Sequence, residues 1–394
     1  MVYGDVMENE FFPALRRVGQ TVYVGLQLPV RATQPELAEA TAIGEQTDHV
    51  FRSLVACLEA AGGSMADLTK LHTYYLFDGD GAAVTDYWER MTAVRLRHLA
   101  NPGPAATALR VQGVGGGAGL IAVDGIAELG GDRQRIMPAH AWDWSMPTPF
   151  SQGWRVGHRI YVGGQISADR QGQALAPGEV QAQTENTLEY IEHVLRDAQA
   201  GWPEVTAIKI AYQHGADADA SRRLGAQIVA GVARRCGAHK PAITMIGVNL
   251  LYEGLLLEID AMASRTPGKP VWPAGSEAWQ LAPQGFAPGW LAGAELHVGA
   301  QAAPGQEGFA AQLDGALARV AAVLAAAHAT PRDLVKLNVF VAAGQPQDLA
   351  DRVRAALREF LVAGRTVLSI VEVAGFMAPG QRVQVDGLAI LGQP

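Results

Sequence analysis

The chain has 394 residues, of which 49% are hydrophobic and 18% charged, and its formal net charge is −8 at pH 7. An acidic chain lacks the basic surface that non-specific nucleic-acid binding needs, so we expect no nucleic-acid partner. The composition predicts ordered domains rather than disorder, because apolar content stays high between the 45 glycines and 21 prolines.

Targeting and cofactor signals are weak. We find no run of eighteen apolar residues and no signal-peptide pattern at the acidic N-terminus, so we expect no membrane helix and a cytoplasmic location. Cys57 and Cys236 are expected to be buried, reduced thiols. Neither a metal-ligand spacing nor a nucleotide fingerprint occurs, so we expect no metal and no cofactor.

A fixed period runs through the chain. Three β-branched stretches end in a glutamine, and Gln27, Gln165 and Gln301 are spaced by 138 and then 136 residues. A phenylalanine precedes each glutamine by fifteen residues, and each period closes on a strand-like stretch, at 121–127, 257–263 and 383–389. Such a period predicts three tandem copies of one domain. We place them at residues 1–135, 136–270 and 271–394.

The three copies share one order of elements. The first predicts, in turn, a strand, a helix, a strand, a helix and two strands, at 21–27, 41–61, 68–76, 86–99, 107–111 and 120–126. The second repeats this order at 159–166, 180–200, 205–212, 218–235, 242–248 and 254–263, and the third at 295–301, 309–327, 334–341, 347–361, 366–373 and 382–390. Linkers are expected near 130–140 and 264–277. The glycine run at 113–119 lacks the strand-to-helix context of a phosphate loop and is interpreted as a flexible connection.

This order predicts an α+β fold of the β-α-β-α-β-β type, with the helices on one face of each sheet. A further N-terminal strand is expected in at least the second and third copies. The uncovered sheet faces need burial, and packing the three copies face to face would supply it. The sequence therefore predicts a pseudo-trimer within one polypeptide; whether the chain self-associates further stays open.

These motifs resemble the Rid family, the YjgF-like reactive intermediate deaminases. The family's strand ending in Gly-Gln-Ile-Pro is matched by G-G-Q-I at 163–166 and G-L-Q-L-P at 25–29. Its closing strand is matched by L-E-I-D-A-M-A at 257–263. Family members are homotrimers with a chorismate-mutase-like fold and a ligand cleft between neighbouring protomers. The resemblance thus implies three interdomain clefts in this chain.

The family's catalytic signature is Pro-Ala-Arg-Ser/Thr, whose arginine grips a substrate carboxylate. The first copy has P-A-A-T at 104–107 and the second has P-A-I-T at 241–244, so both lack the arginine. The third has A-G-R-T at 363–366, and the resemblance then implies that Arg365 is catalytic and binds the substrate carboxylate. Arg110, four residues after Ala106 on the same strand face, is expected to replace the missing grip in the first copy.

The closing strands supply the other expected site residues. Their first acidic position holds Ala122, Glu258 and Gln384, and their second holds Asp124, Asp260 and Asp386. By the resemblance, Glu258, Gln384 and Asp386 join Arg365 as catalytic candidates. Because the aspartate recurs in all copies, a structural hydrogen bond is an equally good interpretation of it. Expected substrate contacts are Phe150 and Phe286, where the family has tyrosine, and Gly163 and Gly299, where it has serine.

Three functions remain open at this point. The resemblance implies a hydrolase or deaminase acting on a small imine, enamine or related carboxylate-bearing metabolite at an interdomain cleft. The alternative is a non-catalytic ligand-binding or scaffold protein, since two copies lack the arginine. A ring-opening amidohydrolase of threefold architecture is the weakest, because it needs repeated serine–lysine pairs. Lys70 and Lys336 align with Ala207, and no serine recurs in the aligned copies.

Overall fold

The computed structural model of the chain describes residues 11–29, 43–79, 81–117, 119–139, 142–144, 146–279, 285–346 and 348–393. These residues form three sheets with helices packed on them, which confirms the α+β prediction. Thr41 and Gln347, where two helices were predicted to begin, lie outside the described residues. We call the three sheets with their helices the first, second and third units.

The three units share one strand order, apart from additional edge strands. The first sheet runs β1-β2-β6-β3-β4, with β1 (Leu15–Val18), β2 (Thr21–Gln27), α2 (Ile43–Ala60), β3 (Leu68–Tyr75), α3 (Gly81–Arg95), β4 (Ala105–Arg110) and β6 (Ile121–Glu128). The second runs β11-β10-β12-β9-β8-β7, with β7 (Arg133–Ile136), β8 (Gly153–Val156), β9 (Arg159–Ile166), α4 (Val180–Asp197), β10 (Val205–Gln213), α5 (Ala218–Cys236), β11 (Ala242–Val248) and β12 (Leu257–Ser264).

The third sheet runs β13-β14-β15-β18-β16-β17-β5. It contains β13 (Gly268–Val271), β14 (Gly289–Ala292), β15 (Glu295–Gln301), α6 (Gly308–Ala326), β16 (Leu334–Ala342), α7 (Leu349–Phe360), β17 (Val367–Val373) and β18 (Val383–Ile390). Its last strand, β5 (Gly113–Val114), comes from the first unit and pairs with β17. The glycine run expected to be a flexible connection is therefore partly a strand of another unit's sheet.

The expected linkers also contain strands. β7 pairs with β8 and β13 pairs with β14, so each belongs to the sheet that follows it in the chain. The boundaries predicted at 135/136 and 270/271 fall inside these two strands. We propose that the units divide just before Arg133 and Gly268.

Each recurring glutamine satisfies a backbone group at a β-bulge. The register of β9 on β12 shifts between Val162 and Gln165, and the equivalent strands of the other units shift at the same motif. In each unit the glutamine amide donates to the carbonyl of the glycine two residues before it, at 2.9 Å for Gln27, 3.2 Å for Gln165 and 3.0 Å for Gln301. A bulge leaves ladder groups unpaired, and this side-chain bond satisfies one of them. The period seen in the sequence is thus a repeated structural device.

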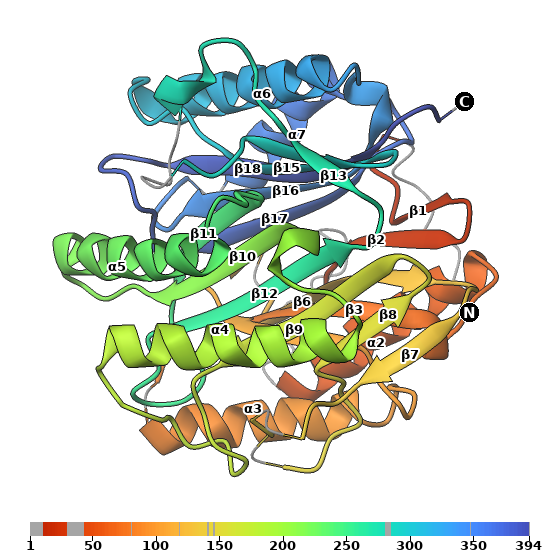
Figure 1. Ribbon diagram of the computed structural model, residues 1–394, viewed down its shortest axis with the longest axis vertical. Coiled ribbons are helices and arrows are strands. Elements are labelled where there is room, and N and C mark those ends of the chain that lie inside the picture. The colour runs from red at the N-terminus through yellow and green to blue at the C-terminus, as the bar shows by residue number, and fades with distance from the viewer. Residues whose placement is uncertain are drawn as a thin grey trace.

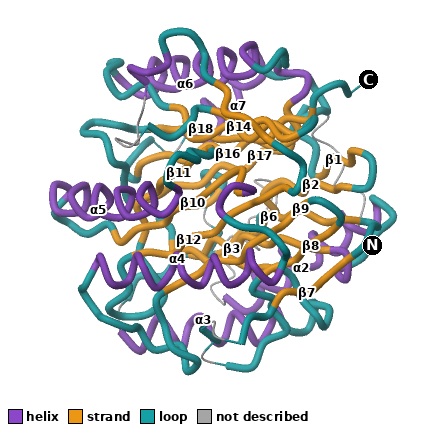
Figure 2. The backbone as a smooth tube through the Cα atoms, viewed as in Figure 1, coloured by secondary structure: helices purple, strands orange, loops and turns teal. Residues whose placement is uncertain are grey.

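The units close on one another in a ring. β4 of the first unit lies against β9 of the second, β11 of the second lies against β15 of the third, and β17 of the third lies against β2 of the first. Figure 1 shows the helices on the outside and the strands gathered between them. Figure 2 shows the same layers, with the sheets occupying the interior. The predicted intramolecular pseudo-trimer is therefore confirmed.

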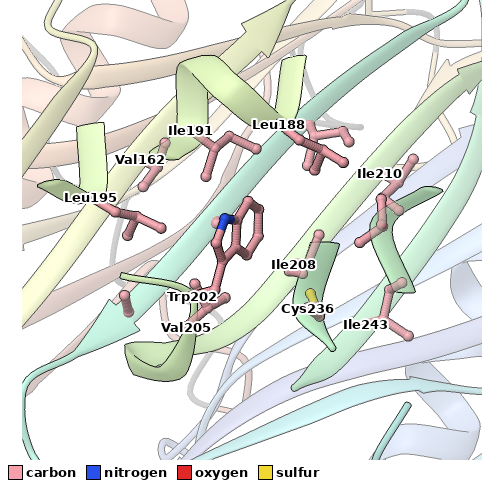
Figure 3. Close-up of a cluster of buried hydrophobic side chains, with 14 of the residues drawn as sticks. Val162, Leu188, Ile191, Leu195, Trp202, Val205, Ile208, Ile210, Cys236 and Ile243 are labelled. Atoms are coloured by element: carbon pink, nitrogen blue, oxygen red, sulfur yellow. The ribbon is translucent and has the colours of Figure 1, made fainter. Parts of the chain in front are cut away.

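Each unit has an apolar core between its helices and its sheet. In the second unit, Leu188, Ile191 and Leu195 of α4 face Ile208 and Ile210 of β10, all of them buried (Figure 3). The spacing of the α4 residues places them on one helix face, as amphipathic packing requires. Both cysteines are buried and form no disulfide, and burial raises the pKa of each thiol to about 12.

One helix departs from a sequence expectation. Among the described residues, α6 is long and apolar enough to cross a membrane by length and composition, although no such span was expected. In this structure its apolar face is packed, with Leu313, Leu317, Val320 and Leu324 buried in the core of the third unit. These contacts are those of a core helix.

Buried aspartates join the units. Asp260 of the second unit lies 3.2 Å from Lys70 Nζ and accepts a hydrogen bond from Thr107 Oγ1 at 3.1 Å, both residues of the first unit. The other borders repeat this with Asp386, bonded by Thr244 at 2.8 Å and 3.7 Å from Lys209 Nζ, and with Asp124, bonded by Ser369 at 2.8 Å and 3.2 Å from Lys336 Nζ. We call these nine residues the aspartate ring.

The aspartate ring is desolvated and mutually satisfied. Asp124, Asp260 and Asp386 are all at least 94% buried. Burial alone would raise the pKa of Asp260, but the charge of Lys70 and the hydrogen bond with His72 outweigh it and hold that pKa well below its usual range. Removing one member of a buried ion pair leaves the other charge unpaired, which costs more than the pair itself contributes.

We expect Asp260→Ala to lower the free energy of unfolding by about 3–5 kcal/mol, because the buried Lys70 would lose its carboxylate and His72 would lose one of its two. Urea denaturation measures it. The control is Asp132→Ala, which removes an ion pair with Arg155 whose aspartate side chain is 78% exposed. Its expected change is below about 1 kcal/mol. Equal effects of the two substitutions would contradict a stabilising role for the aspartate ring.

Candidate active site between the first and second units

The three unit borders place equivalent residues against one another. The strand registers pair Ala106 with Leu71, Ile243 with Ile208 and Leu368 with Leu337, so Ala106, Ile243 and Leu368 are equivalent. Each faces a glycine of the next unit. A Cβ on Gly163 would lie 3.1 Å from the Ala106 oxygen, and one on Gly299 would lie 2.9 Å from the Ile243 nitrogen. Backbone contact therefore explains why these units carry glycine at positions where the resembled family has serine.

This register corrects the alignment of the third copy. The position of the signature arginine is occupied by Leu368, and Arg365 lies three residues earlier, before β17 begins. Arg365 sits near Arg16 of β1, whose pKa is lowered by burial and by the charge of Arg365. The matching of Thr366 with the signature threonine was wrong, because Ser369 is the residue equivalent to Thr107.

The border between the first and second units has a chemically distinctive cleft, which we call the first cleft. It encloses about 420 Å³ of empty space, part of it open to solvent. The first unit contributes Trp88, Arg95, Ala106 and Ala108. The second unit contributes Trp142, Trp144, Phe150, Ile166, Leu251, Tyr252, Leu255 and Glu258. Ala106 and Glu258 share this cleft, so two equivalents of the resembled family's site positions meet here.

Glu258 is the acid of the first cleft. Its side chain is 8% exposed. Burial, followed by the charge of Asp260 two residues along β12, raises its pKa to about 8, although Lys70 and the Ala108 N–H oppose this shift. At neutral pH the carboxyl group is therefore largely protonated and can donate a proton.

Arg95 is the cation of the first cleft. It ends α3 and is only 1% exposed, and its guanidinium lies 4.7 Å from the centre of the Phe150 ring. Burial lowers its pKa to about 9. Among the described residues its guanidinium makes one hydrogen bond, from Nη1 to Thr92 Oγ1, which is long at 3.4 Å. Sequence reasoning missed Arg95, although it continues the buried stripe of Trp88, Met91 and Thr92 at helical spacing.

Three buried N–H donors on residues of the first cleft have no hydrogen-bond acceptor among the described residues. They are Arg95 Nε, Trp88 Nε1 and Trp142 Nε1, all buried. Buried donors in folded proteins are nearly always paired, so each exception needs an explanation. The three donors, one on a cation and two neutral, could be satisfied by hydrogen bonds to an anion. A carboxylate matches the geometry of a guanidinium best.

The other predicted site residues are distributed over several places. Arg110 lies near the first cleft, but its guanidinium donates to the carbonyls of Phe77 at 2.9 Å and Gly79 at 2.6 Å. Gln384 and Gly299 line a second cleft, between the second and third units. Phe286 is buried at that border under Lys240. Asp386 belongs to the aspartate ring, where Thr244 and Asn338 bond its carboxylate.

The third border, between the third and first units, differs again. Backbone of the first unit runs along β17, with the Gln112 N–H donating to Glu372 O at 2.8 Å and the Gly115 N–H to Ile370 O at 2.9 Å. Ala122 occupies the position that Glu258 has in the second unit. This border therefore has no acid at the position equivalent to Glu258.

A hydroxyl group does recur beside lysine, contrary to the sequence alignment. Lys70 Nζ lies 3.0 Å from Thr107 Oγ1, and Lys336 Nζ lies 3.3 Å from Ser369 Oγ. Both hydroxyls are buried and donate to aspartates of the ring, so they are committed to structure. Within the part of the chain that the structure describes, no group of three or more His, Cys, Asp or Glu residues is arranged to hold a metal ion.

The raised pKa of Glu258 makes stability depend on pH. The folded state keeps a proton that the unfolded state loses above about pH 4.5, so the free energy of unfolding falls as pH rises from there to about 8. We expect Glu258→Gln to stabilise the chain by about 2–4 kcal/mol at pH 8.5 and by under about 1 kcal/mol at pH 5, measured by urea denaturation.

Glu295 is the matched control, because its pKa is shifted in the opposite direction. Burial alone would raise that pKa, but His297 and Arg159 outweigh burial and lower it to about 2. Glu295→Gln should then destabilise the chain to a similar extent at both pH values, since the stability it removes is lost only below about pH 4.5. A Glu258→Gln effect equal at pH 5 and pH 8.5 would contradict the raised pKa.

The family model for Endoribonuclease L-PSP matches residues 6–128 and 144–265, which correspond to most of the first and second units. RutC family proteins of Pyrococcus abyssi and Pyrococcus horikoshii are 27% and 26% identical over 115 residues, which is 29% of this chain and 85% and 86% of theirs.

Two solved structures are also similar to parts of the chain. A chorismatase covers 66% of this chain and 78% of its own at 18% identity and a TM-score of 0.48. A Rid family protein of unknown function from Yersinia pestis covers 34% of this chain and 99% of its own at 23% identity and a TM-score of 0.29. The chain belongs to the Endoribonuclease L-PSP family, the YjgF/Rid family that its motifs resemble, and it carries three units of that fold in tandem.

Proposed function

We propose that the first cleft binds a small carboxylate-bearing imine or enamine and hydrolyses it to a keto acid and ammonia. The observation that carries the proposal is the group of three unpartnered N–H donors, one of them on the fully buried Arg95, beside the protonated Glu258. Both cysteines are free thiols, which fits a protein that acts in a reducing compartment such as the cytoplasm.

Arg95 would bind the substrate carboxylate. Arg95 is buried, and the Phe150 ring covers one face of its guanidinium, so little side-chain freedom would be lost on binding. A hydrogen bond to a charged group contributes roughly 1.5–3 kcal/mol in such a setting. Trp88 and Trp142 would donate to the remaining oxygen positions.

Glu258 would transfer the protons. The carboxylic acid donates its proton to the enamine carbon, or to the imine nitrogen, and an iminium forms. Water then adds to the iminium carbon, and the Glu258 carboxylate takes a proton from that water. Glu258, protonated again, gives that proton to the amino group of the carbinolamine. The C–N bond then breaks, ammonia leaves, and the hydroxyl proton returns to Glu258 as the carbonyl forms. A carboxyl group with a pKa near the working pH serves both directions of transfer.

A non-catalytic anion-binding role rests on the same three donors. The two functions differ only in turnover, so one experiment separates them. An amino-acid oxidase generates a 2-imino acid in solution, and the rate of 2-keto acid formation is compared with and without the protein. Binding of the carboxylate without rate acceleration supports the binding role and rejects the hydrolase.

We expect Arg95→Met to lower kcat/KM by about tenfold to a hundredfold, because it removes the carboxylate contact. The matched control is Arg358→Met, which changes the exposed cation over the Phe12 ring at 5.6 Å and should leave kcat/KM within about a factor of two. Arg365→Ala should also have little effect, since Arg365 lies outside the first cleft. Activity that survives Arg95→Met and is lost in Arg365→Ala would reject this assignment.

A further inference from the structure

The second cleft, between the second and third units, has a different chemical character. It encloses about 530 Å³ of empty space. Its lining is Ile243, Met245, Trp279, Ala287, Pro288, Gly299, Ala300, Gln301, Met377, Gln381 and Gln384. None of these described lining residues is ionisable, in contrast to Arg95 and Glu258 of the first cleft.

Cations near the second cleft are engaged elsewhere. Lys240 lies over the Phe286 ring at 5.3 Å and donates to the Ala233 carbonyl at 2.9 Å. Arg319 lies over the Trp279 ring at 5.3 Å and donates to the Ala302 carbonyl. An anion that entered this cleft would lose its hydration, and the described lining residues offer no cation to pair with it. Such a transfer is energetically costly.

A glutamine pair supplies the polarity of this cleft. Gln384 replaces Glu258 at the equivalent strand position, and its Nε2 donates to the Met245 carbonyl at 2.7 Å. Its Oε1 accepts from Gln381 Nε2 at 3.1 Å. A primary amide has two N–H donors and two lone pairs, so one donor and one acceptor of Gln384 stay available. Both glutamines are buried, and this pairing fixes the orientation of the free amide edge.

We propose that the second cleft binds a neutral, planar molecule that carries an amide-like edge. Its ring would lie among Met245, Met377 and Trp279, since thioethers and aromatic rings pack favourably on planar groups. Its donor–acceptor edge would pair with Gln384. This site is independent of the function proposed for the first cleft, and it gives one chain two ligand sites of opposite preference.

The probes are 4-fluorobenzamide, which is neutral, and 4-fluorobenzoate, which has the same shape and carries a charge. Binding is followed by fluorine NMR of the ligand on the full chain. We expect Gln384→Leu to weaken benzamide binding about tenfold, since losing one to two hydrogen bonds costs about that factor. Ala300→Phe, at a half-buried lining position, should block benzamide binding by filling the cleft.

Glu258→Gln is the control, because it makes the matching change in the first cleft and should leave benzamide affinity unchanged. The proposal is overturned if the unaltered chain does not bind benzamide at millimolar concentration. It is also overturned if Gln384→Leu and Ala300→Phe both leave benzamide affinity unchanged, or if benzoate competes with benzamide for the same site. An unchanged benzoate affinity in Arg95→Met would count against the first cleft alone and would leave the benzamide result standing.

Discussion

Three buried carboxylates hold this molecule together. Each aspartate of the ring belongs to one unit and takes its lysine and its hydroxyl partner from the preceding unit. The bonding pattern is therefore cyclic, and no unit supplies the lysine for its own aspartate. Separating the units would break these bonds and expose the apolar sheet faces around them to water, so the closed assembly is favoured. Covalent linkage adds to this, since it makes association of the units intramolecular.

Divergence within the ring has been compensated. Ala207 stands in the second unit where Lys70 and Lys336 stand in the others, and Lys209 lies two residues further along the same strand. A shift of two residues keeps a side chain on the same sheet face, so the charge still reaches Asp386. The ring also influences chemistry, because Asp260 lies one strand repeat from Glu258 and helps to raise its pKa.

The features that repeat in all three units could be predicted from the sequence, and the features found in one unit alone could not. The glutamine and glycine motifs predicted three units, because they encode a bulge that every unit needs. The sequence alignment places the signature of the third unit three residues too early. Thr366 matches the threonine of the signature, but the strand register shows that Ser369 holds the equivalent position. Arg95 could not be predicted as a site residue, because a single sequence does not show which side chains surround a charged residue on a buried helix face. The sequence predicts linkers where the edge strands β7 and β13 lie, because such short strands show little alternation of apolar and polar residues.

An equivalent phenylalanine lies under a cation at every border, yet only one of these three cations is fully buried. Phe150, Phe286 and Phe12 are covered by Arg95, Lys240 and Arg358 at 4.7, 5.3 and 5.6 Å. Arg358 is exposed and Lys240 is half-buried, so water screens both. Arg95 is desolvated, and a desolvated cation interacts far more strongly with an anion than a hydrated one does. The contact with the ring is thus a shared feature of the fold, and burial is the property that turns one of the three cations into a candidate substrate group.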